Sequence, residues 1–527
     1  MSRLAALVLL AAMACTSAAP PTPAPAPASP PAARPAPILP GAVIRIDDLR
    51  RDLTTFASDE FRGRETGTPD IMKAARFIAD RLTALGLEPA GDSGFYGRVP
   101  MERQTFGAST HITVTVRGES APRTLEIGRE LLPLLELSPA LPPPKTRADA
   151  ELVFAGYGSI PALSRNDLAG LDLGGKAVVI VNGAPANASA TQRAELETAD
   201  QIGNRLQEVL MRRPAAVIVL LAGASEELYT QMLPGVIRSV SLVQERTEVP
   251  EDSRPLPMVL IGRIHNGSPL LPTGWPADDR PQTLTGRRFS AQLEILRERF
   301  TGYNLVAVAR GTDPSLNRSY VAFGAHYDHI GVLPAAGGDS IANGADDDGS
   351  GSMTMLEIAR AFKARPTRRS ALFVWHIGEE KGLLGSEYFV NHPTVPLDSV
   401  VAQINADMIG RNAADLLYVV GPAAAPNGQS RALGRIVDSV NAALPTPFVF
   451  NREWDSSTHP EHIYERSDHY NYAQKGIPIV FLTSGLHDDY HKVSDEVSKI
   501  DFAKMARVAE LLFGTGQAVG NRLSRPR

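Results

Sequence analysis

The sequence predicts an α/β fold with a mainly parallel central sheet flanked by helices, interrupted by an inserted β-rich segment. Two observations support this fold class. From about residue 301 onward, near-continuous apolar runs alternate with helical patterns, as expected for strands that are buried on both faces. Between residues 147 and 300 the pattern changes to short β-rich runs, with a helical pattern only around 199–211. We therefore expect two architectures in one chain.

The composition excludes several classes of protein. The chain has 527 residues, of which 43% are hydrophobic and 21% charged, so a large core is expected and global disorder is excluded. Lys and Arg number 53 against 58 Asp and Glu, and the net charge of −5 gives no basic field for nucleic acid. The single Cys excludes a disulfide framework and a Cys-rich zinc module. We expect no nucleic-acid partner.

Residues 1–15 are expected to be a signal segment. Arg3 precedes a short apolar stretch of small residues that ends at Cys15, the only Cys in the chain. This stretch is too short for a stable membrane span and is typical of an export signal. It resembles a bacterial lipoprotein signal with Cys15 as the lipidated residue, whereas ordinary secretory cleavage near Ala18 is the alternative. We expect an exported protein, either secreted or on the periplasmic side of the bacterial envelope, that touches a membrane only through this anchor.

Residues 16–41 are expected to be a linker, since Pro and Ala dominate the segment. Such a composition cannot pair its backbone in a sheet or bury a core, so an extended spacer is expected. The following residues, 42–146, are assigned to the N-terminal part of a catalytic domain. They contain an amphipathic helical pattern at 71–85, ending at Gly86, and a strand pattern of period two at 110–117. The proline-rich stretch 139–144 marks the expected boundary.

Residues 147–300 form the expected insert. Its β-rich runs are at 151–158, 166–181 and 214–221. The order of strand, turn, Gly-Lys and strand resembles a protease-associated (PA) domain, a β-rich insert of exported peptidases. A stabilising β-rich segment without a further role is the alternative interpretation, and no group of catalytic residues is recognisable in it.

Residues 301–520 carry the alternation that predicts the parallel sheet. Strands are expected at 320–325, 371–375, 400–405, 416–420 and 477–482, and helices at 352–364, 430–444 and 502–514. In sheets of this kind, ligands bind beyond the carboxyl ends of the strands. The loops that follow the strands are therefore the expected location of a functional site.

Five of these loops supply an acid or an imidazole. They contain His326 and Asp328, the triplet Asp346–Asp348, the pair Glu379 and Glu380, Asp407, and finally Tyr490 and His491. Imidazoles and carboxylates without a thiolate are ligands for a borderline divalent metal, most plausibly zinc. Adjacent carboxylates repel each other, so a pair at a strand end suggests that one binds metal while the other handles protons. The acidic Gly-rich loop can supply a carboxylate that bridges two ions.

These motifs resemble the M28 family of zinc exopeptidases. The resemblance rests on His326-Tyr-Asp328, Gly344-Ala-Asp-Asp-Asp-Gly-Ser-Gly351, Glu379-Glu380, Asp407-Met-Ile-Gly410 and Tyr490-His491. Two further patterns near the end of such chains are Arg466-Ser-Asp-His469 and Gly476-Ile-Pro478. The resemblance covers about residues 301–515 and includes the helical segment from 47 to 145. It implies a zinc-exopeptidase fold with two zinc ions per chain and peptide substrates.

The resemblance also implies the metal ligands. His326 and Asp407 would bind one zinc ion, and Glu380 and His491 would bind the other. Asp347, the second Asp of the triplet, would bridge both ions. This arrangement is that of a co-catalytic centre, in which the metal lowers the pKa of bound water from 15.7 to about 7.

Further roles are implied for groups beside the metals. Glu379 would be the general base that takes a proton from water and returns it to the leaving amine. Tyr490 would help to polarise the scissile carbonyl, and Asp328 would orient the first imidazole ligand. Asp346 and Asp348 are expected to be solvated turn carboxylates. No role is expected for the other histidines of this region, His329, His376, His459, His462, His469 and His487.

The leading functional prediction is an aminopeptidase that hydrolyses terminal peptide bonds. A carboxypeptidase-type hydrolase of the same family remains open, because neither an ammonium pocket nor an Arg pocket for a carboxylate is recognisable in the sequence. Glutaminyl cyclases resemble the family but use one zinc ion, and receptor modules on this fold have lost ligands. The complete two-metal ligand set argues against both.

Overall fold

A computed structural model describes the chain over residues 44–135, 142–226, 239–243 and 255–526, together with the isolated positions 228, 229, 232 and 236. The signal segment predicted at 1–15 and the linker predicted at 16–41 lie outside the described residues. The described chain forms two compact units. The smaller unit contains Glu102–Ser239 and Val243–Glu298, and the larger unit contains the residues from 44 to Met101, Val240–Leu242 and the residues from Arg299 onward.

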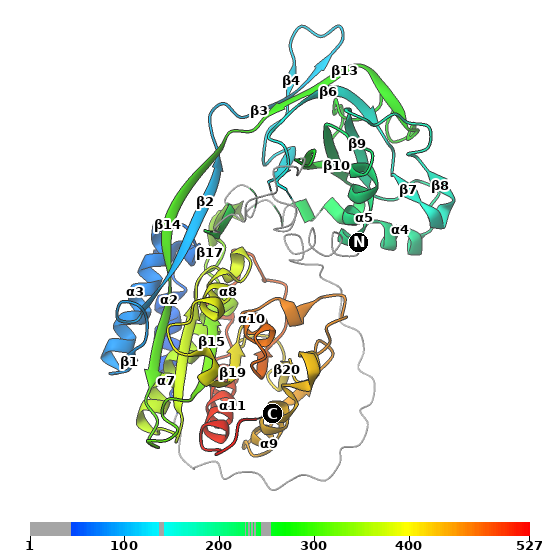
Figure 1. Ribbon diagram of the computed structural model, residues 1–527. Helices are drawn as coiled ribbons and strands as arrows, with labels where there is room; N and C mark the ends of the chain where they lie inside the picture. The colour runs from blue at the N-terminus through cyan, green and yellow to red at the C-terminus, as the bar shows by residue number, and fades with distance from the viewer. Residues whose placement is uncertain are drawn as a thin grey trace. The chain divides into compact units, whose positions relative to one another are not determined.

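The larger unit is built on a mixed sheet with a parallel centre (Figure 1). The central strands run parallel in the order β18 (Ser370–His376), β15 (Tyr320–His326), β19 (Val400–Ala406) and β22 (Ile479–Thr483). The flanking strands are β14 (Ile295–Ala309), antiparallel to β18, β20 (Leu416–Val420), antiparallel to β22, β21 (Val449–Asn451), β1 (Glu88–Pro89), β2 (Tyr96–Phe106) and β11 (Ser239–Leu242). The α/β fold class predicted from the sequence is confirmed.

Helices cover both faces of this sheet, which explains why its strands are apolar at nearly every position. One face packs against α2 (Ile46–Phe56), α3 (Pro69–Ala84), α7 (Gly351–Ala364), α9 (Arg431–Ala442) and α11 (Phe502–Gly520). The other face packs against α8 (Leu384–Asn391) and α10 (His469–Gln474). The helices predicted at 352–364, 430–444 and 502–514 are therefore present, with α11 extending six residues further.

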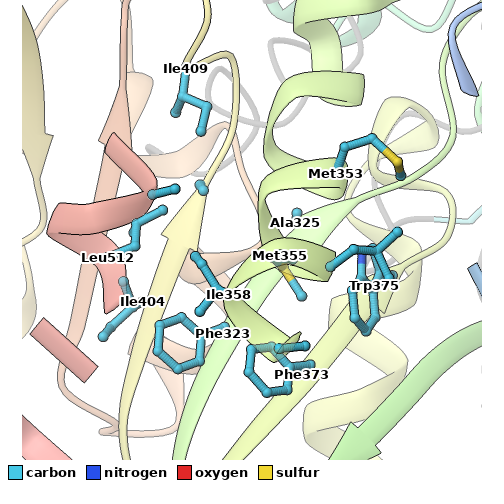
Figure 2. Packing of buried hydrophobic residues seen from close by; sticks show 14 of the residues in the cluster. Phe323, Ala325, Met353, Met355, Ile358, Phe373, Trp375, Ile404, Ile409 and Leu512 are labelled. Atoms are coloured by element: carbon cyan, nitrogen blue, oxygen red, sulfur yellow. The ribbon is translucent and has the colours of Figure 1, made fainter. Parts of the chain in front are cut away.

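Side chains of successive strand residues enter opposite cores, as the period of two requires. Phe323 of β15 lies in the core beneath α7 and α11, whereas its neighbour Ala322 lies in the core beneath α8 and α10. Figure 2 shows Met355 of α7 close to the rings of Phe323 and Phe373, which stack with their centroids 5.2 Å apart. A Cβ at Gly516 of α11 would collide with the Phe323 ring. Such close packing gives the strand ends a rigid base.

Helix ends follow local chemistry. Pro69 occupies the first turn of α3, where its missing N–H is not needed, and Gly86 follows the helix with φ of 66°. Asp501 caps α11 by accepting hydrogen bonds from the backbone N–H groups of Ala503 and Lys504. Of these signals, Gly86 marked the end of the helix predicted at 71–85.

The smaller unit contains a sheet with a parallel centre of its own. Its strands follow the order β4 (Arg123–Thr124), β3 (His111–Val116), β13 (Gln282–Gln292), β6 (Arg147–Phe154), β9 (Ala177–Asn182), β10 (Ala216–Leu221), β12 (Met258–Arg263) and β5 (Leu131–Leu134). The central strands, from β6 to β12, are parallel. Two helices, α4 (Ala190–Leu196) and α5 (Ala199–Leu210), lie between β9 and β10 in sequence, so the pattern near 199–211 is a helix as expected.

The smaller unit begins at Glu102, whereas the sequence placed the start of the insert at residue 147. Strand pairing accounts for this difference. β3 pairs antiparallel with β13, and β5 pairs antiparallel with β12, so residues assigned to the catalytic domain complete this sheet instead. The proline-rich stretch is thus no boundary, although residues 136–141 themselves lie outside the described residues.

Among the residues that the structure describes, no helix combines the length and the apolar character needed to cross a membrane.

Arg64 connects the N-terminal segment to the carboxyl end of the central sheet. Its guanidinium is fully buried and donates hydrogen bonds to four backbone carbonyls, those of Phe56, Tyr327, Asn343 and Gly344, over 2.7–3.2 Å. Burial lowers the pKa of Arg64 to about 10, while nearby carboxylates raise it, so the group stays charged at neutral pH. Arg64 therefore holds the loop after β15 and the loop before α7 together.

Replacing Arg64 by Met should lower the free energy of unfolding by at least about 3 kcal/mol, because each unsatisfied buried carbonyl costs roughly 1–3 kcal/mol. Urea unfolding monitored by circular dichroism measures this change. The matched control is Arg76→Met on the exposed side of α3, where a change within about 0.5 kcal/mol is expected. Equal stability of the Arg64 and Arg76 variants would contradict the account.

Candidate metal centre

All the site residues predicted from the sequence lie at the carboxyl ends of the central strands or in the loops that follow them. His326 is the last residue of β15, and Asp407 directly follows β19. Glu379 and Glu380 begin the short turn η5 (Glu379–Lys381) after β18. The remaining ligands lie in the turn η4 (Ala345–Ser350), which leads into α7, and in the loop after β22. Parallel strands end at the same edge, so the chain topology brings these groups together.

One group of ligand atoms surrounds His326. Its Nε2 atom lies 3.2 Å from Oδ1 of Asp347, 3.6 Å from Oδ1 of Asp407 and 3.8 Å from Oε2 of Glu379. The His326, Glu379 and Asp407 atoms lie within 4.8 Å of one another. These residues include both ligands predicted for the first ion.

A second group surrounds His491. Its Nε2 atom lies 2.9 Å from Oε2 of Glu380 and 3.2 Å from Oδ2 of Asp347. Asp347 thus turns Oδ1 toward His326 and Oδ2 toward His491. A carboxylate whose two oxygens face two separate imidazoles has the arrangement of a ligand that bridges two cations.

The donor set fits divalent cations. Nε2 of His326, Nε2 of His491, Oδ2 of Asp347 and Oδ1 of Asp407 are buried, and none makes a hydrogen bond to any described residue. Buried polar atoms normally find hydrogen-bond partners, so four convergent atoms without one indicate a different kind of partner. Nitrogen and carboxylate donors suit zinc.

Burial opposes the negative charges of this site. It raises the pKa of the Glu379 carboxyl well above its ordinary value and also raises the pKa of Asp407. Burial acts in the same direction on Glu380 and Asp347, but the surrounding imidazoles outweigh it. They bring the pKa of Glu380 to about 2 and hold the pKa of Asp347 well below its ordinary range. Clustered buried carboxylates need compensating positive charge, which a divalent cation supplies.

The two imidazoles respond in the opposite sense. Burial alone would lower the pKa of His326 and of His491, but the carboxylates that face each ring raise both well above the ordinary value. Both imidazoles therefore favour the protonated form, in which a proton occupies the position that a metal cation would take. Metal binding at these nitrogens is expected to release protons.

Asp328 contacts His326 differently from the prediction. Nδ1 of His326 lies 3.1 Å from the backbone carbonyl of Asp328, whereas the Asp328 carboxylate is 3.7 Å from the same atom. The carboxylate instead accepts hydrogen bonds from Oγ1 of Thr66 and the backbone N–H of Glu379. Asp328 thus fixes the first imidazole through its main chain and the η5 turn through its side chain.

The expectation that Asp346 and Asp348 are solvated turn residues is wrong. Both side chains are fully buried. Asp348 accepts hydrogen bonds from the backbone N–H groups of Gly351 and Met408, and Asp346 accepts one from Gly410 at 2.6 Å. The α7 loop and the loop after β19 are thereby joined, which holds Asp347 between them. A run of three acids did not reveal this, because its appearance in sequence is the same whether it is solvated or buried.

A buried chain of hydrogen bonds supports Asp407, and the sequence reasoning missed it. Ser467 donates to Oδ2 of Asp407 at 2.7 Å, Asn405 donates to Ser467 at 2.9 Å, and Gln403 donates to Asn405 at 2.9 Å. The signal was present in the Arg466-Ser-Asp-His469 pattern and in two amides on an otherwise apolar strand.

Tyr490 lies beside the second group. Its ring stacks on that of His491 with centroids 3.8 Å apart, and its Oη accepts a hydrogen bond from Arg466 at 3.2 Å. Because Arg has donors only, Tyr490 accepts this hydrogen bond through its oxygen.

His329, to which the sequence assigned no role, lies within the second group. Its Nδ1 atom is 2.7 Å from Oε1 of Glu380 and 3.7 Å from Oδ2 of Asp347. The His329, Asp347 and Glu380 atoms form a second set within 4.8 Å of one another. A single His three residues after a recognised ligand carried no distinguishing signal in the sequence.

Comparison with known proteins gives matches to one peptidase family. Residues 304–515 match the model of peptidase family M28. Leucine aminopeptidase 1 of Trichophyton rubrum is 31% identical over 247 residues, which cover 44% of this chain and 62% of that protein. Leucine aminopeptidase 1 of Arthroderma gypseum is 32% identical over 243 residues, covering 43% of this chain and 60% of that one. The chain thus spans about three fifths of the length of these curated relatives.

Solved structures show the shared fold. An aminopeptidase from Aneurinibacillus sp. strain AM-1 has a TM-score of 0.56 at 18% identity, covering 92% of this chain and 96% of that one. A zinc aminopeptidase from Bacillus subtilis has a TM-score of 0.53 at 18% identity, covering 92% and 97%.

Adding Zn²⁺ to chelator-treated protein should raise its melting temperature, because a cation that binds only the folded site stabilises it by about 2.7 kcal/mol at 100 times its Kd. Differential scanning calorimetry at several zinc concentrations measures the shift. Asp407→Asn should show a smaller shift, whereas Asp438→Asn, on the exposed face of α9, should match the wild type. A melting temperature that zinc leaves unchanged would argue against a metal centre.

Proposed function

Residues 304–515 of this chain belong to peptidase family M28. We propose that the chain uses two bound zinc ions to hydrolyse the peptide bond at the amino terminus of its substrates. The observation that carries the proposal is the position of Asp347, with one oxygen toward His326 and the other toward His491. The choice of aminopeptidase is supported by the two relatives named leucine aminopeptidase 1.

In this proposal His326 and Asp407 would hold one zinc ion, Glu380 and His491 would hold the other, and Asp347 would contribute a carboxylate oxygen to each. Zinc supplies Lewis acidity, which makes water a nucleophile near neutral pH and polarises a carbonyl. The protein contributes the rigid spacing of these ligands, since each one comes from a loop anchored to the packed sheet.

Glu379 serves as the general base. Its carboxylate faces the first group of ligand atoms from 3.8 Å, and its side chain is only 10% exposed. Burial raises the pKa of this carboxyl, and a raised pKa suits a carboxylate that accepts a proton from water and returns it to the leaving amine. The backbone N–H of Glu379 donates to the Asp328 carboxylate at 3.2 Å. This hydrogen bond fixes the main chain from which the Glu379 side chain extends.

Tyr490 donates its hydroxyl hydrogen to the oxygen of the scissile carbonyl as negative charge develops there. The proposal is supported by the stacking of the Tyr490 ring on that of His491, which places Tyr490 beside the second group of ligand atoms. Removal of one such donor typically costs about 3–4 kcal/mol in the transition state.

We also propose that the protein is exported and acts on peptides, with Cys15 as a lipid anchor and no nucleic-acid partner. The apolar stretch before Cys15 and the net charge of −5 support this. The smaller unit is proposed to be a PA-like accessory domain. Its β-rich composition supports this assignment, and no metal-binding group of His, Cys, Asp or Glu is found among its described residues.

Glu379→Gln should lower kcat by at least about 100-fold, because general-base catalysis contributes roughly 10²–10⁴-fold. Its zinc content should stay at two ions per chain, since Glu379 is not a proposed ligand. Steady-state kinetics and elemental analysis measure the two quantities. Glu195→Gln, on the exposed side of α4, is the control that should keep full activity. Retained activity of Glu379→Gln would remove the base from the mechanism.

Asp347→Ala should lose zinc as well as activity, because one carboxylate serves both ions. Elemental analysis after gel filtration in zinc-free buffer measures the loss. Two ions per chain in this variant would mean that another group bridges them.

A panel of free and N-blocked peptides, assayed with and without a chelator, tests the choice of substrate end. Cleavage that requires a free amino terminus and is abolished by the chelator is expected. Cleavage that requires a free carboxyl terminus would identify a carboxypeptidase, and the absence of all cleavage would contradict a peptidase.

A further inference from the structure

His329 is a buried imidazole beside the second group of ligand atoms, and the proposed mechanism does not use it. The side chain has no exposed surface. Nδ1 of His329 lies 2.7 Å from Oε1 of Glu380, while the other oxygen, Oε2, lies 2.9 Å from Nε2 of His491. The two imidazoles thus contact different oxygens of one carboxylate.

The chemistry of this contact determines where the hydrogen lies. An ionised carboxylate accepts hydrogen bonds and cannot donate them, so Nδ1 of His329 carries the hydrogen and donates to Glu380. A nitrogen that carries hydrogen has no lone pair for a metal. Nε2 of the same ring is buried and makes no hydrogen bond to any described residue, so Glu380 is the polar partner of this side chain.

The backbone around His329 holds the ring in place. The N–H of His329 donates to the carbonyl of Arg64 at 3.3 Å, and Glu65 forms an isolated parallel bridge with the same residue. The ring packs against Gly344, where a Cβ would collide with it, and the carbonyl of Gly344 accepts a hydrogen bond from Arg64. The imidazole is therefore fixed from both sides, unlike a carboxylate at the end of a flexible Glu side chain.

We propose that His329 is a positioning residue whose Nδ1–H holds Oε1 of Glu380, so that Oε2 is left to bind the metal ion shared with His491. This proposal rests on the proposed function for the identity of the ion. A Glu side chain has three rotatable bonds, and fixing one oxygen removes most of the freedom of the other. Partners of this kind typically change metal affinity by about 10–100-fold.

Calorimetric titration of metal-free protein with Zn²⁺ tests the proposal on three proteins, the wild type and two variants. His329→Ala should bind one ion like the wild type and the other about 10–100-fold more weakly. His329→Asn should restore the affinity to within a few-fold, because its amide N–H occupies nearly the position of Nδ1–H. The control is His392→Ala. His392 is exposed at the C-terminal end of α8, and this variant should bind both ions normally.

Each departure from these results overturns the inference. If His329→Ala binds both ions like the wild type, His329 does not position Glu380. If His329→Asn is as weak as His329→Ala, the hydrogen bond is not what matters. Wild-type protein that binds no zinc would overturn the proposed function itself, which separates the two failures.

A second measurement needs no variant and covers the case in which a buried substitution prevents folding. In a crystal structure of the zinc-loaded wild type, Nδ1 of His329 should stay within hydrogen-bond distance of Glu380. A distance of about 2.0–2.1 Å from Nδ1 to zinc would make His329 a metal ligand and would overturn the positioning role.

Discussion

The candidate metal centre depends on one buried carboxylate, that of Asp347, which faces an imidazole on each side. Its side chain is almost inaccessible to water, and its two oxygens lie 3.2 Å from Nε2 of His326 and 3.2 Å from Nε2 of His491. Ionised groups are stable in such surroundings only when opposite charge compensates them. The rest of the larger unit is a scaffold that keeps this carboxylate and its neighbours in place.

The scaffold reaches well beyond the part of the chain that matches the peptidase family. The match covers residues 304–515, yet Arg64 and Thr66 lie far before it. Arg64 holds the carbonyls of both loops that flank the site, and Thr66 donates to the Asp328 carboxylate. The buried pair of Lys381 and Glu65, 3.0 Å apart, joins the η5 turn to the same segment. The N-terminal segment is thus part of the unit that holds the candidate metal centre.

The sequence was sufficient to predict the sheet and the acids and imidazoles that meet at its carboxyl edge, because both have strong local signals. Buried parallel strands are apolar at nearly every position, and the acids and imidazoles lie at their ends or directly after them. The sequence was not sufficient to predict the role of side chains that belong to the site only because they are buried beside it. Asp346, Asp348 and His329 have ordinary sequence surroundings, and only the packing of distant loops makes them buried partners of the site. The start of the smaller unit was misplaced for a similar reason, since the pairing of β3 with β13 joins residues more than 150 positions apart.

The central claim is that two cations share Asp347, and anomalous diffraction at the zinc absorption edge tests it most directly. The account predicts two anomalous peaks in crystals grown with zinc, about 3.5–4 Å apart as in two-metal sites. One peak should lie between His326 and Asp407 and the other between Glu380 and His491, each bonded to one oxygen of Asp347. A single peak, or two peaks that do not share this carboxylate, would contradict it.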